Sequence, residues 1–136
     1  MNALDLVKHW PVDNYAAAVI DGEDIHRVGD LGKVFELMSV TKPLSSYGFL
    51  MAMEEGIFEL DTPLGPEGST VRHLLAHASG VGFNHGDRER APGERRIYSN
   101  QGFEILADAV EDAAGMTFAE YLQLGIMEPL NMKWTR

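Results

Sequence analysis

The chain has 136 residues, no cysteine, and 21 acidic against 11 basic side chains, so its formal net charge is −10. A hydrophobic content of 45% is ordinary for a globular chain of this length and argues against wholesale disorder. The acidic balance argues against nucleic-acid and anionic-membrane partners, and the lack of cysteine excludes disulfides, thiolate nucleophiles and Cys-ligated zinc.

The N-terminus has no basic segment followed by a long apolar run, so it does not have the pattern of a signal peptide. No stretch approaches the ~20 consecutive apolar residues that a transmembrane helix needs. We therefore expect a single cytoplasmic domain over residues 1–136, with no membrane partner. No repeat or interdomain linker interrupts it.

The predicted strands all fall within the first 38 residues. Residues 3–10 predict a short amphipathic helix that Pro11 ends. The apolar run 15–20 is followed by Asp21-Gly22, a strong hairpin dipeptide, and residues 25–28 form the return strand. The apolar residues 34–38 predict one more short strand.

The rest of the chain predicts helices. From Ser39 onwards, apolar residues recur at three- and four-residue steps as far as Glu55-Gly56, where a helix would stop. Capping residues predict three further helices, over 69–77, 99–115 and 117–124. Residues 79–96 predict a long surface loop of the kind that often carries function. The fold class is therefore α+β, predominantly helical with a short N-terminal antiparallel ribbon.

The segment with most chemical content is Ser39-Val40-Thr41-Lys42. If Ser39 opens a helix, Lys42 lies one turn later on the same face, within reach of the serine hydroxyl. A desolvated lysine can take the hydroxyl proton during nucleophilic attack, and a helix N-terminus offers N–H groups to an oxyanion. The spacing alone is a weak signal, because a capping serine with an exposed lysine is the commoner arrangement.

A second element, Tyr98-Ser99-Asn100, follows the long loop and opens a predicted helix. Beside a lysine ammonium, the phenolate of a tyrosine becomes accessible and can act as a general base. Asn100 can offer its amide to a substrate carbonyl and to the lysine. The alternative is a half-buried loop aromatic at Tyr98 and a helix cap at Asn100.

Together these motifs resemble the serine β-lactamase and penicillin-binding (DD-peptidase) superfamily. The resemblance is to its class C-like branch, which also contains esterases and D-amino-acid amidases. The segments that carry it, in family order, are 35–42 (FELMSVTK), 55–63 (EGIFELDTP), 70–81 (TVRHLLAHASGV), 98–103 (YSNQGF) and 127–133 (MEPLNMK).

The resemblance implies a role for each matching residue. Ser39 is the acylated nucleophile, and its backbone N–H forms half of the oxyanion hole. Lys42 activates the serine, and Tyr98 acts as general base and then as acid to the leaving group. Asn100 binds the substrate. The implied reaction is acyl transfer from a small ester, amide or β-lactam to serine and then hydrolysis, with no cofactor.

The family's third motif, a Lys- or His-x-Gly tripeptide, has no counterpart after Tyr98. The chain therefore resembles the N-terminal half of a β-lactamase/transpeptidase-like fold, without its C-terminal sheet strands. Because unpaired strand edges invite association, we hypothesise self-association or pairing with a complementary C-terminal fragment. The alternative to an enzyme is a catalytically incomplete homologue that acts as a binding or assembly module.

His73 and His77 stand four residues apart on a predicted helix, a spacing that can bind zinc. No Glu follows His73 as the metalloprotease pattern requires, and no third ligand is evident. We therefore expect both histidines to be structural and no metal to bind.

Overall fold

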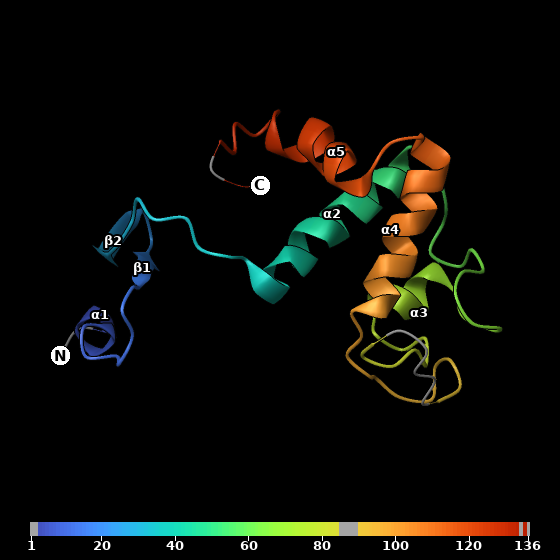
Figure 1. The fold of residues 1–136 in the computed structure, drawn as a ribbon, viewed down its shortest axis with the longest axis horizontal. Helices are drawn as coiled ribbons and strands as arrows, with labels where there is room; N and C mark the ends of the chain where they lie inside the picture. The colour runs from blue at the N-terminus through green and yellow to red at the C-terminus, as the bar shows by residue number, and fades with distance from the viewer. Residues whose placement is uncertain (1–2, 85–89, 134, 136) are drawn as a thin grey trace. The chain divides into compact units, whose positions relative to one another are not determined.

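The computed structural model describes residues 3–84, 90–133 and 135. The chain divides into two compact units, Met1–Glu36 and Leu37–Arg136 (Figure 1). Five α-helices and one antiparallel pair of strands in the described residues confirm the predicted α+β class. None of the helices in those ranges is long and apolar enough to cross a membrane.

The N-terminal unit contains a short helix and a β-hairpin, namely α1 (Ala3–Val7), β1 (Ala16–Asp21) and β2 (Asp24–Gly29). Asp21 pairs with Asp24, which leaves Gly22 and Glu23 as the two-residue turn. Gly22 has a φ of 60°, and a glycine at this first central position is the mark of a type II′ hairpin turn. The hairpin predicted from Asp21-Gly22 is confirmed, and α1 is shorter than the predicted helix.

The prediction of a strand over residues 34–38 is wrong. Residues 34–37 have no regular structure, and Met38 begins a 3-10 turn. The large apolar side chains of this segment are exposed, from 39% at Leu37 to 75% at Met38. Within the described part of the chain the sheet consists of β1 and β2 alone, so this segment has no neighbouring strand with which to form a ladder.

The C-terminal unit consists mainly of helices, in the chain order η1 (a 3-10 turn, Met38–Val40), α2 (Thr41–Glu54), α3 (Val71–Leu75), α4 (Gln101–Ala114), α5 (Phe118–Leu122) and η2 (a π-helical turn, Gln123–Met127). Thr117 caps α5, as the sequence predicts, and it does so in a capping box with Glu120. Gly115, with a φ of 69°, ends α4.

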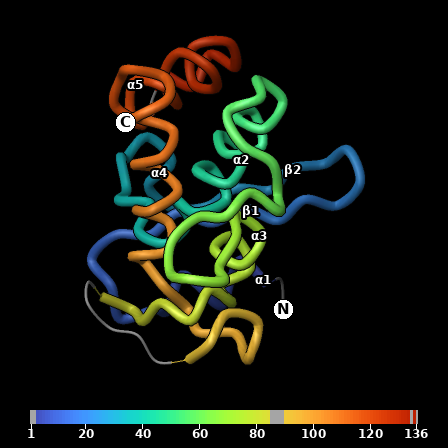
Figure 2. The backbone as a smooth tube through the Cα atoms, turned by 90° about the vertical axis from the view of Figure 1, so that its right-hand side faces the viewer, coloured from blue at the N-terminus to red at the C-terminus, as the bar shows by residue number. Residues whose placement is uncertain are grey.

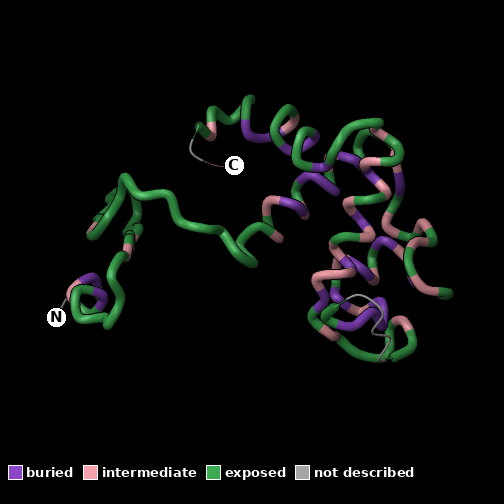
Figure 3. Tube along the Cα trace, viewed as in Figure 1, coloured by how far each residue is buried: buried purple, intermediate pink, exposed green. Residues whose placement is uncertain are grey.

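The hydrophobic core of this unit lies where α2, α4 and α5 pack together (Figures 1–3). Phe49 of α2 is fully buried, stacks on Phe118 at 4.7 Å between ring centroids, and meets Phe103 edge-on at 5.8 Å. Aromatic contacts of this kind add to the free energy of burial and hold the helices in register. The core residues are Phe49, Ala52, Phe58, Val71, Leu74, Leu106, Val110, Phe118, Tyr121, Leu122, Ile126 and Met127.

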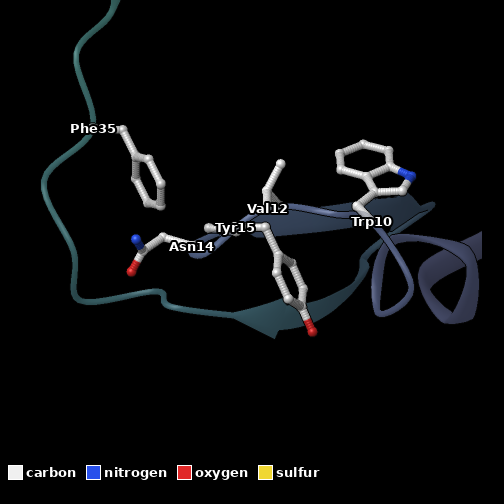
Figure 4. Close-up of a pocket in the computed structure, with 6 residues that line it drawn as sticks. Trp10, Val12, Asn14, Tyr15 and Phe35 are labelled. Carbon is white, nitrogen blue, oxygen red and sulfur yellow. The ribbon is translucent and has the colours of Figure 1, made fainter.

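A pocket of about 260 Å³ lies within the N-terminal unit. Figure 4 shows its largely apolar lining, which consists of Trp10, Val12, Asn14, Tyr15, Ala16 and Phe35. It contains none of the predicted site residues, because Ser39 and its proposed partners all belong to the C-terminal unit.

Candidate active site

Ser39 lies at the centre of the exposed turn η1, which runs directly into α2. Lys42 is the second residue of α2, so the two side chains are one turn apart, as the spacing predicts. Pro43 is the third residue, where a missing N–H removes no intrahelical bond. Met38 has a φ of 48°, a strained backbone conformation for a side chain of this size immediately before Ser39.

The Lys42 side chain extends from α2 to the start of α4. Its Nζ donates a hydrogen bond of 2.7 Å to Oδ1 of Asn100, a residue 58 positions later in the chain. The same nitrogen lies 4.6 Å from the centre of the Tyr98 ring and 5.6 Å from that of Phe103, both within cation–π range. The amine therefore lies against the faces of two aromatic rings and donates a hydrogen bond to Asn100.

Ser99 and Asn100 make different contacts at the start of α4. Ser99 is buried, and its Oγ accepts a hydrogen bond from the Gly102 N–H at 2.9 Å while donating to the Gly82 carbonyl at 2.6 Å. Asn100 occupies the cap position but makes no side-chain cap bond. Because Ser99 satisfies the helix terminus, the amide of Asn100 is available to Lys42.

The Tyr98 side chain lies near Lys42 and is influenced by Ser39 as well. The neighbouring Lys42 amine, and after it the Ser39 hydroxyl, lower the pKa of the Tyr98 phenol, whereas burial acts in the opposite direction. The side chain is 40% exposed, so a substrate can approach it. Stabilising the phenolate is what makes a tyrosine useful as a general base near neutral pH.

Sequence reasoning missed the aromatic surroundings of Tyr98. The ring centroid of His77 lies 4.7 Å from that of Tyr98, and that of Phe83 lies 6.1 Å away. His77 is not on α3 as predicted, because the helix ends at Leu75 and His77 has a φ of 57°. No spacing in the sequence indicates this contact, since the two residues are 21 positions apart on a folded loop.

His73 and His77, whose spacing could bind zinc, each make a hydrogen bond to a different partner. Nδ1 of His73 pairs with Oγ1 of Thr70 at 3.1 Å, and Nδ1 of His77 accepts a hydrogen bond from the Ser99 N–H at 3.2 Å. Among the described residues, no three His, Asp or Glu side chains gather as a metal site. These contacts give each imidazole a structural explanation.

The structure thus brings all four predicted residues to one place, at the junction of η1, α2 and the start of α4. The Tyr98 ring lies beside the amine of Lys42, at 4.6 Å from Nζ to the ring centre. Asn100 holds that amine and presents the rest of its amide beside it. The arrangement suits acyl transfer to serine, in which a proton must leave the nucleophile.

A profile of the β-lactamase family matches residues 12–136. The crystal structure of a β-lactamase from Mycobacterium bovis is 48% identical, with a TM-score of 0.89 over 96% of this chain and 48% of its own. Penicillin-binding protein 4* of Bacillus subtilis is 29% identical over 76% of this chain and 30% of its own length.

A D-alanyl-D-alanine-carboxypeptidase/endopeptidase of Escherichia coli K12 is 28% identical over 77% of this chain and 37% of its own length. The chain therefore spans about half or less of the length of each of these three relatives.

Proposed function

This chain belongs to the β-lactamase family, and on that premise we propose that it is a serine hydrolase that is acylated on Ser39 and then deacylated by water. The observation that carries the proposal is the place of the Lys42 amine, one helical turn after Ser39, at 4.6 Å from the centre of the Tyr98 ring. A serine hydroxyl is a poor nucleophile until a neighbouring base takes its proton, and in this proposal Tyr98, beside Lys42, is that base.

In the proposed reaction, the Ser39 Oγ attacks the substrate carbonyl while its proton passes to the Tyr98 phenolate. Lys42 stabilises that phenolate. The backbone N–H of Ser39 stabilises the developing oxyanion. Tyr98 then returns the proton to the leaving group, and water attacks the acyl-enzyme by the reverse route. Asn100, whose Oδ1 accepts the hydrogen bond from Lys42, orients the substrate amide or acyl chain through its N–H₂ group.

The proposed substrate class is a small ester or amide, including β-lactams. The proposal includes a cytoplasmic localisation of the protein, and cell fractionation tests this. Two of the relatives are named for penicillin binding and for D-alanyl-D-alanine cleavage, which supports an amide-type acyl donor.

Intact-mass spectrometry tests the proposal directly. The chain is exposed to a fluorophosphonate and, separately, to a penicillin, and we expect one covalent adduct from each. Ser39→Ala removes the adduct, whereas Ser45→Ala, a buried serine further along the same helix α2, retains it. A folded chain that takes neither adduct, or an adduct that survives in Ser39→Ala, contradicts the proposal.

A second candidate function is that of a binding or assembly module. The observation in its favour is a run of exposed large apolar side chains that precedes and includes η1, namely Val34, Phe35, Leu37, Met38 and Val40 (Figure 3). Apolar exposure of this extent favours self-association or a complementary C-terminal fragment. Sedimentation that finds a concentration-independent monomer, without change on adding such a fragment, contradicts it.

A further inference from the structure

His77 is a buried residue that is tied to the chain on both sides of Tyr98. It is 6% exposed and directly follows Ala76, the C-cap of α3. Its backbone carbonyl accepts a hydrogen bond of 2.7 Å from the Ile97 N–H, and its side-chain Nδ1 accepts one of 3.2 Å from the Ser99 N–H. One residue thus anchors the backbone immediately before and immediately after Tyr98.

The imidazole also packs on the rings that surround the Lys42 amine. Its centroid lies 4.7 Å from that of Tyr98 and 5.2 Å from that of Phe103. The Lys42 Nζ faces these same two rings, at 4.6 and 5.6 Å from their centres. The position of the Tyr98 ring beside Lys42 therefore depends on its contact with His77.

This arrangement needs an uncharged imidazole. A nitrogen that accepts a hydrogen bond from a backbone N–H carries no proton, so the proton of neutral His77 is on Nε2. Among the described residues, the titratable and charged groups that act on the ring are Tyr98, Arg96 and Lys42, and the packing element α4 contributes the uncharged Phe103. Burial, followed by the charges of Arg96 and Lys42, lowers the pKa of His77.

We propose that His77 is a positioning residue for the Ser39 acylation, in which its neutral imidazole holds the 97–99 backbone and the Tyr98 ring against Lys42. This inference rests on the proposed function. It assigns to His77 two separable contributions, a hydrogen-bond acceptor for Ser99 and a ring for Tyr98 to pack against. Losing either one lets the phenol move away from the lysine, and a shift of about 1 Å in a catalytic group can cost on the order of a hundredfold in rate.

Two substitutions separate these contributions. His77→Phe keeps a ring but has no acceptor for the Ser99 N–H. His77→Asn keeps an acceptor, and asparagine tolerates the left-handed φ of 57° better than other residues with a side chain, but it has no ring. The matched control is His73→Asn, which removes the nearby α3 histidine whose Nδ1 bonds Thr70 rather than the site.

The first measurement is the 13C chemical shift of the tyrosine Cζ atoms against pH, with the Tyr98 signal assigned by its loss in Tyr98→Phe. We expect the Tyr98 midpoint to rise in both His77 variants and to stay unchanged in His73→Asn. The second is the rate of fluorophosphonate labelling of Ser39 against pH, which should fall roughly tenfold to a hundredfold in His77→Phe and less in His77→Asn. The wild-type rate should also fall at acid pH, where the imidazole gains its proton.

Folded His77 variants that keep the wild-type Tyr98 midpoint and label within about twofold of the wild type overturn the proposal. If His77→Phe does not fold, His77→Asn alone decides, by the same two readings. A wild-type chain that takes no label refutes the proposed function instead, and the Tyr98 midpoint then decides the positioning role by itself.

Discussion

Replacing Gly80 by alanine should strongly destabilise the fold. Gly80 has a φ of 81°, which costs a residue with a side chain about 1–2 kcal/mol. An added Cβ would also lie 2.0 Å from the carbonyl oxygen of Arg90, a backbone atom that cannot rotate away. Overpacking of this kind costs about 1–3 kcal/mol more, so the expected loss is roughly 2–5 kcal/mol.

Gly56 provides the matched control, because it has a φ of 80° and an added Cβ there would meet nothing within 4 Å. Gly56→Ala therefore measures the cost of the backbone conformation alone, and the difference between the two variants isolates the clash with Arg90. The assay is urea unfolding followed by circular dichroism, with equal m-values as the test that both variants unfold alike. Gly80→Ala and Gly56→Ala that differ by less than about 0.5 kcal/mol would refute the steric argument.

Three further predictions concern the site and the core beneath it. Lys42→Met should raise the pKa of Tyr98, because the neighbouring amine that lowers it is lost, and ultraviolet titration of tyrosinate checks this. The pKa of His77 is lowered in the folded protein, so the unfolded chain binds more protons below pH ~6.5 and the free energy of unfolding should fall as the pH drops from there. Unfolding at several pH values should show that the free energy of unfolding depends less on pH in His77→Asn than in the wild type. Leu106→Ala, at a fully buried position of α4, should cost about 2–5 kcal/mol in the same unfolding assay, and a loss below about 1 kcal/mol would contradict the assignment of Leu106 to the core.

Local chemistry in the sequence was sufficient to predict several elements. The hairpin follows from Asp21-Gly22, because a glycine tolerates the positive φ that the tight turn demands. The start of α5 follows from Thr117, whose capping box uses Glu120 only three residues later. Each of these signals depends on residues within one turn of each other, so no knowledge of the rest of the fold is needed.

The same holds for half of the candidate site. Ser39 and Lys42 are three residues apart, so a helical turn alone brings them together. Tyr98 and Asn100 were predicted from a resemblance that joined them to Ser39 and Lys42, and their roles remain predictions. The structure adds the contacts that sequence spacing cannot give, above all the 2.7 Å bond from Lys42 to Asn100.

Only the tertiary structure decided where partners from distant parts of the chain would meet. Residues 34–38 have the composition of a strand, but a strand forms only where a neighbouring ladder is available, and none of the described residues supplies one there. His77 has the spacing of a helical residue, yet α3 ends at Leu75 and the chain turns into the left-handed region. That turn brings its imidazole against Tyr98, and a periodic pattern in the sequence has no means of recording a contact made across a loop.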